Sequence, residues 1–230
     1  MAIPNEEAAA EEFDRWAHAG RAESMARGHR RPTGSALDVW TLNEADTVLD
    51  VGCGNGWAVR WLIERGAGRG IGVDISPAMI QRAKDAVGED SRFSFEVSSG
   101  EDLPCDDDSV THLLSVESLY YYPQPEQALK EWARVLKTGG KMAIVLDLYQ
   151  ENAGAHVWVD VLPIDVHLLS AEEYCRMAKE AGFAEVSWRQ VKDPRPPTPE
   201  SEFEPSKYWP TYAMYLEYHL QGSLIVEATR

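Results

Sequence analysis

Short apolar runs alternate with amphipathic stretches from residue 46 to the end of the chain. Five early runs have the length and the β-branched content of strands, and they cover residues 47–51, 70–74, 93–97, 110–116 and 141–147. Between them, apolar residues recur at helical spacing over residues 57–65, 77–87 and 125–136. This alternation predicts an α/β fold in which helices cover both faces of a mostly parallel sheet.

The last third of the chain predicts one more helix and two more strands. Ser170 and Glu173 have the spacing of a capping box, and the helix that they open ends at Gly182. Strand patterns follow at residues 184–191 and 223–228, with a proline-rich stretch and an aromatic segment between them. Too few residues follow the prolines to build a domain, so we predict a loop between the two final strands.

Residues 1–45 predict a helical lead-in, or cap, that precedes the first strand. An Ala/Glu-rich segment opens it, and a second helical segment covers residues 35–42. The residues that share one face of the first segment are Phe13, Trp16 and Ala17. The length of 230 residues fits a single domain, so residues 46–230 are expected to fold together.

The charge balance argues against nucleic acid as a partner. The chain has 22 Lys and Arg residues against 38 Asp and Glu residues, so its formal net charge is −16. A surface this acidic repels phosphate backbones. A small ligand that is neutral or cationic therefore fits better.

The same inventory predicts a cytoplasmic protein without a membrane span. No apolar run reaches the roughly 18 residues that a span needs, and the acidic start of the chain lacks the apolar core of a signal peptide. Cys53, Cys105 and Cys175 lie far apart and form no C-x-x-C pair. We therefore expect neither a disulfide framework nor a metal site.

The most informative motif is a glycine loop directly after the first strand. Asp50 is followed by Gly52, Gly54 and Gly56 at alternate positions, and a predicted helix begins at Trp57. The dinucleotide fingerprint needs a glycine where Trp57 stands, which argues against a pyrophosphate ligand. The Asp50 carboxylate at the strand end suits an ammonium group of a ligand, and the helix N-terminus suits a ligand carboxylate. An amino-acid moiety carries both groups, so these two features together favour it.

Asp74 ends the second predicted strand, 18 residues after Gly56. A carboxylate at this position is placed to accept hydrogen bonds from two ribose hydroxyls. The alternative is that Asp74 caps the helix that opens at Pro77, a role that Ser76 also suits.

Four segments in this order resemble class I S-adenosylmethionine-dependent methyltransferases, in particular the small-molecule branch that includes ubiquinone- and menaquinone-type enzymes. The segments are Asp50 to Gly56, Asp74-Ile-Ser, the Ser99-Gly-Glu-Asp-Leu-Pro element and residues 133–140. The resemblance covers roughly residues 46–150. It implies a Rossmann-like sheet of seven strands with the last strand antiparallel, S-adenosylmethionine as cofactor and S-adenosylhomocysteine as product.

The resemblance also implies roles for individual residues. Asp50 and the loop from Gly52 to Gly56 would hold the methionyl part. Cys53 belongs to this loop, and we expect its side chain to pack rather than react. Asp74 would hold the ribose, and Ile75 would pack on the adenine.

Two further segments are expected to contact the adenine amino group and the sulfonium of the cofactor. Family members often carry Asp-Ala where this chain has Ser99 and Gly100, so the adenine contact falls to backbone N–H groups, to Ser99 or to Glu101. The end of the fourth strand, from Ser115 to Glu117, would face the sulfonium.

Methyl transfer from a sulfonium is an in-line displacement, so holding the acceptor in line supplies most of the acceleration. A general base is needed only if the acceptor carries a proton that must leave. Glu117 and Tyr121 are the candidate catalytic residues, with Tyr120 and Tyr122 as neighbours able to orient an acceptor. The alternative is that these aromatic residues cover the sheet edge and that Glu117 caps a turn.

The methyl acceptor is expected to be a small molecule bound beside two insertions, residues 148–169 and 193–219. The first contains Trp158, Leu162, His156 and His167; the second contains Tyr212, Tyr215 and His219, at the spacing of one helical face. Arg21 and His29 are further candidates for closing the site, with surface salt bridges as the alternative. We expect entry of the acceptor near residues 120–122 and Trp158.

Two rival functions fit parts of the sequence. The first is a protein that binds S-adenosylmethionine or S-adenosylhomocysteine without catalysis, because Asp50, the glycine loop and Asp74 bind rather than react. The second is a nicotinamide oxidoreductase on a similar sheet, against which Trp57 argues.

Overall fold

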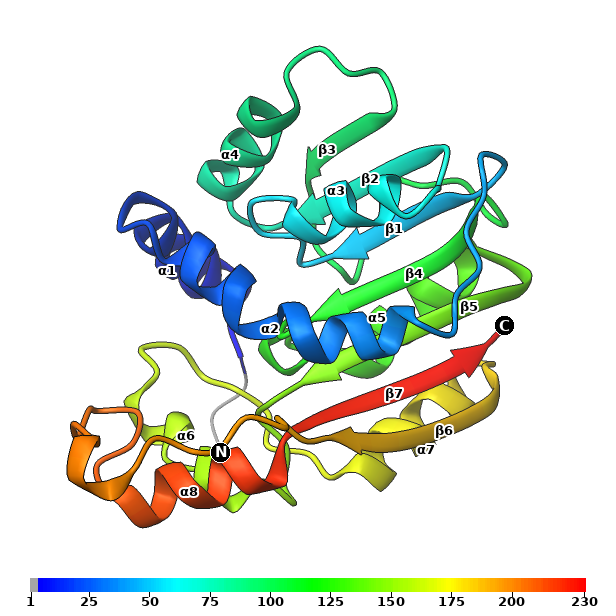
Figure 1. The fold of residues 1–230 in the computed structure, drawn as a ribbon. Helices are drawn as coiled ribbons and strands as arrows, with labels where there is room; N and C mark the ends of the chain where they lie inside the picture. The colour runs from blue at the N-terminus through cyan, green and yellow to red at the C-terminus, as the bar shows by residue number, and fades with distance from the viewer. Residues whose placement is uncertain (1–3) are drawn as a thin grey trace.

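Seven strands form one twisted sheet in the computed structural model, which describes residues 4–230 (Figure 1). The strand order is β3-β2-β1-β4-β5-β7-β6. Strands β1 to β5 pair in parallel, and β7 is antiparallel to both of its neighbours. The strands are β1 (Thr47–Val51), β2 (Arg69–Asp74), β3 (Phe93–Val97), β4 (Val110–Val116), β5 (Leu136–Leu146), β6 (Ala184–Val191) and β7 (Ser223–Thr229). The predicted fold class, including the antiparallel last strand, is confirmed.

Helices cover both faces of this sheet. On one face lie α2 (Arg21–Leu37), α3 (Trp57–Glu64) and α4 (Pro77–Val87), and on the other lie α5 (Pro125–Val135) and α7 (Ala171–Glu180). The apolar stripe of each helix packs on buried strand residues, which read as nearly continuous apolar runs because both faces are covered. The capping box of Ser170 and Glu173 opens α7, as the sequence predicts.

Strand β5 begins five residues earlier than the sequence indicates. Leu136 directly follows α5 and already pairs with Val110, whereas regular pairing with β4 resumes only at Lys141, opposite His112. The register shift lies between these two pairs. The residues between Leu136 and Lys141 are polar and glycine-rich, so no strand pattern marks them in the sequence.

The N-terminal helices differ from the expected second segment. Helix α1 (Glu6–His18) is followed directly by α2, which ends at Leu37, so residues 38–42 are not helical. Pro32 lies inside α2 and is buried, and Leu37 packs in the core under α3. Tertiary packing therefore sustains a helix that its proline and glycines conceal in the sequence. Residues 1–3 of the predicted lead-in lie outside the described residues.

The two predicted insertions contain short helices that lie side by side (Figure 1). Between β5 and α7 lie η2 (Ala153–Ala155) and α6 (Trp158–Val161). Between β6 and β7 lie η3 (Glu200–Glu202) and α8 (Tyr212–Gln221), so the proline-rich stretch is a loop between the last two strands, as predicted. A Cβ on Gly154 would lie 2.2 Å from the backbone nitrogen of Tyr218, so only glycine permits this close approach of η2 to α8.

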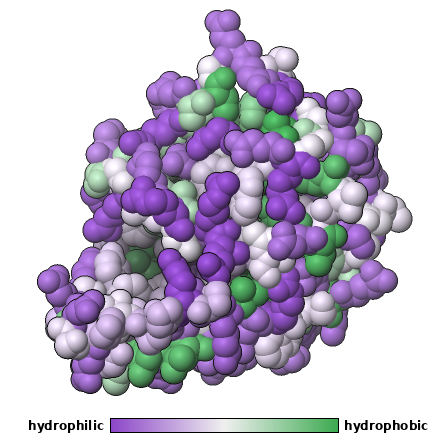
Figure 2. Space-filling view, viewed as in Figure 1, coloured by the Kyte–Doolittle hydropathy of each residue, from purple (hydrophilic) through white to green (hydrophobic). Residues whose placement is uncertain are grey.

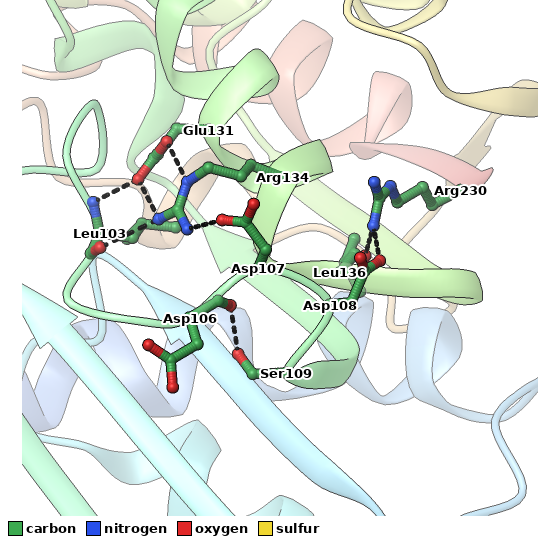
Figure 3. A network of polar contacts seen from close by, with 9 residues as sticks. All are labelled: Leu103, Asp106, Asp107, Asp108, Ser109, Glu131, Arg134, Leu136 and Arg230. Carbon is green, nitrogen blue, oxygen red and sulfur yellow. Dashed lines mark hydrogen bonds and ion pairs between the residues drawn. The ribbon is translucent and has the colours of Figure 1, made fainter.

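A polar network anchors the loop that leads from β3 to the start of β4 (Figure 3). Because β4 is parallel to β1, its start lies at the opposite end of the sheet from the glycine loop, which follows the end of β1. Arg134 on α5 donates hydrogen bonds to Asp107, to Glu131 and to the carbonyl of Leu103. Glu131 in turn accepts the backbone N–H of Leu103 at 2.9 Å. The network fastens this loop to α5 and leaves the site end of the sheet free of these contacts.

Within residues 4–230, no helix has both the length and the apolar character needed to cross a membrane.

Candidate functional site

Two adjoining pockets lie at the carboxyl ends of the parallel strands, the edge where α/β sheets bind ligands. The glycine-loop pocket lies over the ends of β1 and β2 and is lined by Gly52, Gly54, Asp74 and Ile75, among others. The aromatic pocket, with a volume of about 440 Å³, lies beside it toward β5. Both pockets are lined by Trp16, Met25, Glu117 and Tyr121.

The three glycines of the loop serve two different roles. All have positive φ angles, between 52° and 78°. A Cβ on Gly52 would lie 2.4 Å from the Cβ of Ser118, and one on Gly56 would lie 2.7 Å from the ring of Phe95. A Cβ on Gly54 would meet no described atom within 4 Å. Gly52 and Gly56 therefore serve packing, whereas Gly54 leaves open space in the pocket.

Asp50 lies beneath the loop and is 2% exposed. Its Oδ1 atom is buried and has no hydrogen-bond partner among residues 4–230. Burial, followed by repulsion from Asp74, raises the pKa of Asp50 to about 8. An unpaired buried carboxylate is costly, so this group suits a cationic ligand that approaches through the loop.

Asp74 ties the loop to the end of β2. Its carboxylate accepts hydrogen bonds from the backbone N–H groups of Gly54 (2.8 Å) and Ser76 (2.9 Å). Burial raises the pKa of Asp74 to about 6, although both hydrogen bonds oppose that shift. The helix cap belongs to Ser76, whose hydroxyl accepts the N–H of Met79. Asp74 is thus left to line the pocket.

The segment after β3 contributes differently from the sequence expectation. Ser98 and Gly100 line the glycine-loop pocket. The Ser99 hydroxyl instead bonds Glu6 of α1, and the Glu101 carboxylate accepts the N–H of Gln124 at 2.7 Å. Of residues 99–101, only Gly100 therefore borders the glycine-loop pocket, on which Ile75 also lies.

Two further predicted site residues have side chains in the core. Cys53 packs with Val59 and Phe95, and burial raises the pKa of its thiol, as expected of a packing residue. Ser115 is fully buried, and its hydroxyl pairs with that of Ser118 at 2.6 Å. Contrary to expectation, Ser115 does not line either pocket within the described chain; Val116, Glu117 and Ser118 line the glycine-loop pocket instead.

Glu117 stands at the junction of the two pockets. It follows the end of β4 with a φ of 55°, in the left-handed region that residues other than glycine rarely adopt. The carboxylate accepts the hydroxyl of Tyr120 at 2.7 Å and the backbone N–H of Asp147. Burial, and then the neighbouring Asp147 carboxylate, raises the pKa of Glu117 well above its ordinary range.

The three tyrosines after Glu117 are divided between the pockets. Tyr120 lines the aromatic pocket, Tyr122 lines the glycine-loop pocket, and Tyr121 lines both. The ring of Tyr121 contacts that of Tyr120, with centroids 4.4 Å apart, and that of Phe13 on α1. His167, a predicted acceptor-side residue, supports this turn by bonding the carbonyl of Tyr122.

The outer wall of the aromatic pocket comes from both insertions. Trp158, Trp209 and Tyr218 form a mutual cluster with ring centroids 5.1 to 6.1 Å apart. The predicted stripe of Tyr212, Tyr215 and His219 does share one face of α8, but the residue of α8 that lines this pocket is Tyr218. Figure 2 shows a hollow with an apolar floor between the N-terminal helices and the segment around α8.

The polar end of the aromatic pocket holds His29 of α2, Glu117 and Asp147. One ligand atom from each lies within 4.8 Å of the others, an arrangement that is also able to hold a metal ion. The Asp147 carboxylate accepts the hydroxyls of Tyr218 and Ser223. The Nδ1 atom of His29 lies 3.6 Å from Asp147 and is buried without a hydrogen-bond partner in the described part of the chain. Burial lowers the pKa of His29, although Asp147 opposes that shift.

The N-terminal helices cover both pockets. Phe13 and Trp16 of α1 and Met25 of α2 line the glycine-loop pocket. Asp14 accepts the backbone N–H of Ala78 at the start of α4, and Arg82 of α4 donates to the carbonyl of Ala17. These few contacts fasten α1 over the end of β2.

Several pocket residues were not identified from the sequence. They are Met25, Ser98, Ser118, Asp147 and Tyr218. Only Asp147 carries a usable signal, because it follows β5 as a carboxylate at a strand end, the same feature that identified Asp74. The others enter the site through tertiary packing.

Comparison with known proteins identifies related sequences and structures. The family described as "Methyltransferase domain" matches residues 49–144. One solved structure contains a methyltransferase in complex with the Trm112 methyltransferase activator of Haloferax volcanii, and the sequence of this methyltransferase is 36% identical to this chain. It has a TM-score of 0.86, and the match covers 95% of this chain and 97% of that one.

Two curated relatives match over shorter regions. Methyltransferase GfsG of Streptomyces halstedii is 31% identical over 56% of this chain and 48% of its own length. Erythromycin 3''-O-methyltransferase of Saccharopolyspora erythraea is 30% identical over 66% of this chain and 55% of its own length. The chain therefore spans about half the length of the curated relatives that it matches.

Proposed function

Because this chain belongs to the S-adenosylmethionine-dependent methyltransferases, we propose that it transfers a methyl group from this cofactor to a small-molecule acceptor. The observation that carries the proposal is the junction of the two pockets at Glu117. One pocket is built on the glycine loop and the other is a separate aromatic pocket, and they share one wall. A donor and an acceptor bound in the two pockets would meet there.

The glycine-loop pocket and Asp50, which is buried beneath the loop and does not itself line the pocket, fit the cofactor. The orphaned Oδ1 of Asp50 suits the ammonium group of a methionyl moiety, and the open space at Gly54 suits the close approach of its chain. Asp74 borders the same pocket and would accept the ribose hydroxyls, with Ile75 against the adenine. When bound, the cofactor supplies an electrophilic methyl group on a positively charged sulfur.

The protein's own contribution to the reaction would be alignment and exclusion of water. Glu117 and Tyr121 line both pockets and would position the acceptor against the methyl group. Trp16 and Met25 border the same junction from the N-terminal helices and would keep water out. Glu117 would take a proton from acceptors that must lose one.

Two measurements test this proposal. Calorimetry should show binding of S-adenosylhomocysteine and none of NAD. Incubation with S-adenosylmethionine and a panel of small acceptors should then release S-adenosylhomocysteine, measured by mass spectrometry. Binding without release for any acceptor would favour the rival non-catalytic protein; binding of NAD alone would favour the oxidoreductase.

The acidic composition supports a small-molecule acceptor over nucleic acid. The net charge of −16 opposes a phosphate backbone, and two buried carboxylates line the aromatic pocket. The three cysteines are free thiols, which supports the cytoplasmic location expected from the sequence.

A protein partner is a second element of the proposal. The relative from Haloferax volcanii, similar over nearly its whole length, is bound to the Trm112 methyltransferase activator. We propose that this chain also binds a Trm112-type activator. Co-expression with that activator should yield a one-to-one complex on size-exclusion chromatography; separate elution of the two proteins would contradict it.

A further inference from the structure

The polar end of the aromatic pocket presents hydrogen-bond acceptors without a matching cation. Glu117 and Asp147 are both buried, and together with His29 they bring three acceptor atoms within 4.8 Å of one another. With its proton on Nε2, the His29 ring offers the unpartnered Nδ1 lone pair to the same space. Arg21, the one arginine or lysine in the described lining, is exposed and bonds Tyr208 at the rim.

The number and type of these atoms fit a primary ammonium group. An ammonium group has three N–H donors and no acceptor. With each acceptor about 2.9 Å from the nitrogen, tetrahedral geometry separates the acceptors by about 4.7 Å. The Nδ1 atom of His29 lies 3.6 Å from Asp147, so these two side chains move apart by about 1 Å when the ammonium binds between them.

The aromatic wall of the pocket also suits an organic cation. The rings of Trp158, Trp209 and Tyr218 pack against one another, and Tyr218 donates its hydroxyl to Asp147 at 2.6 Å. Aromatic faces attract ammonium groups and accommodate apolar substituents. A hydrated metal ion needs water and polar ligands there, which these faces do not supply.

We propose that the acceptor is a small amine, which binds as its ammonium form with the nitrogen between His29, Glu117 and Asp147 and its apolar part against Trp158 and Trp209. This proposal rests on the methyltransferase activity proposed above and specifies its substrate class. It identifies His29 and Asp147 as substrate-binding residues and Glu117 as the proton acceptor.

The reaction balances in two steps. The bound ammonium group favours the ionised form of Glu117, against the burial that raises its pKa. One N–H proton of the ammonium then passes to this carboxylate, which leaves a neutral amine with a free lone pair. The lone pair would then form the N–C bond to the methyl carbon while the C–S bond breaks, and the electron pair of the C–S bond would stay on sulfur. The products are a methylated ammonium and a neutral thioether, and the proton on Glu117 leaves to solvent.

The test compares two probes of nearly equal shape, 2-phenylethylamine and 2-phenylethanol, binding to protein saturated with S-adenosylhomocysteine. Calorimetry at pH 7 should show at least tenfold tighter binding of the amine. Turnover with S-adenosylmethionine should methylate the amine and leave the alcohol unchanged. Equal affinity, or methylation of the alcohol alone, would overturn the proposal while leaving the methyltransferase function intact.

Variants locate the effect. Asp147→Asn should weaken binding of the amine at least tenfold and leave binding of the alcohol unchanged. It should also keep the affinity for S-adenosylhomocysteine, because Asp147 lines the aromatic pocket and not the glycine-loop pocket. Trp209→Leu removes part of the aromatic wall and leaves His29, Glu117 and Asp147 in place, and it should also weaken binding of the amine. Asp165→Asn, an exposed loop carboxylate, is the matched control and should change nothing.

Two further outcomes separate the possible failures. Stoichiometric binding of Mg²⁺ or Mn²⁺ alone, lost in Asp147→Asn and competitive with the amine, would show a metal site and overturn the proposal. Absence of S-adenosylhomocysteine binding to the wild-type protein would instead show that the proposed function itself is wrong.

Discussion

The carboxylate of Asp74 accepts a hydrogen bond from the backbone N–H of Gly54 at 2.8 Å, across 20 residues of sequence. This contact joins the end of β2 to the middle of the glycine loop, so the two halves of the proposed cofactor site form one unit. Gly54 has open space on its Cβ side, and Asp74 borders that space.

Replacing Gly54 by alanine should weaken the binding of S-adenosylhomocysteine at least tenfold, because the new Cβ enters the pocket. Its φ of 52° also costs an alanine about 1–2 kcal/mol of stability. Gly139→Ala is the matched control, since Gly139 has a φ of 79°, no described atom near its Cβ, and lies in β5 away from the site. Calorimetry should show that both variants lower the melting temperature equally and that only Gly54→Ala loses affinity for S-adenosylhomocysteine. Unchanged affinity in both would remove Gly54 from the cofactor site.

Replacing Asp74 by alanine should reduce the affinity for S-adenosylhomocysteine more than tenfold. Each ribose hydrogen bond to the carboxylate contributes about 1.5–3 kcal/mol. Ser76→Ala is the comparison, because it removes the cap of α4 and no ribose acceptor. If both variants lower the melting temperature and neither changes the affinity, Asp74 serves only the local turn.

Asp50 should release a proton when the cofactor binds near neutral pH. Its pKa of about 8 keeps it mostly protonated in the free protein, whereas an ammonium group beside it favours the charged form. Affinity should therefore rise with pH from 6 toward 8 and level off above the pKa. Calorimetry in buffers of different ionisation enthalpy measures this release, and Asp50→Asn should abolish it. A wild-type affinity that is independent of pH over this range would contradict the prediction.

The same shift has a consequence for stability in the free protein. The folded pKa of Asp50 lies above its unfolded value of 3.8, so the folded state binds the extra proton between these pH values. Asp50 therefore costs stability increasingly as pH rises toward 8. Asp50→Asn should melt like the wild type at pH 4 and at a higher temperature at pH 9. A constant difference across this range would place its cause elsewhere.

The N-terminal helices should become ordered when S-adenosylhomocysteine binds. They line the glycine-loop pocket through Phe13 and Trp16 and are fastened to α4 by a few polar contacts, including Asp14 to Ala78. Amide hydrogen exchange over residues 12–30 should slow in the complex. Protection restricted to the glycine loop and Asp74 would show that these helices are a structural appendage.

The sequence by itself determined the order of strands and helices, the glycine loop and the carboxylate at Asp74. These features depend on local spacing: apolar periodicity sets the element type, and a strand end followed by a glycine turn places its residues at one edge of the sheet. Helix α2 and the early start of β5 were the exceptions, because packing overrode weak local signals there.

The tertiary structure decided which side chains share a pocket. Ser115 turns into the core while Glu117, two residues later, enters both pockets, because the positive φ of Glu117 breaks the alternation of the strand. His29, Glu117 and Asp147 come from α2 and from the ends of β4 and β5, and no local pattern links residues so far apart. The cofactor was therefore predictable from a local motif, whereas the proposed acceptor site depends on the packing of the N-terminal helices and the two insertions on the sheet.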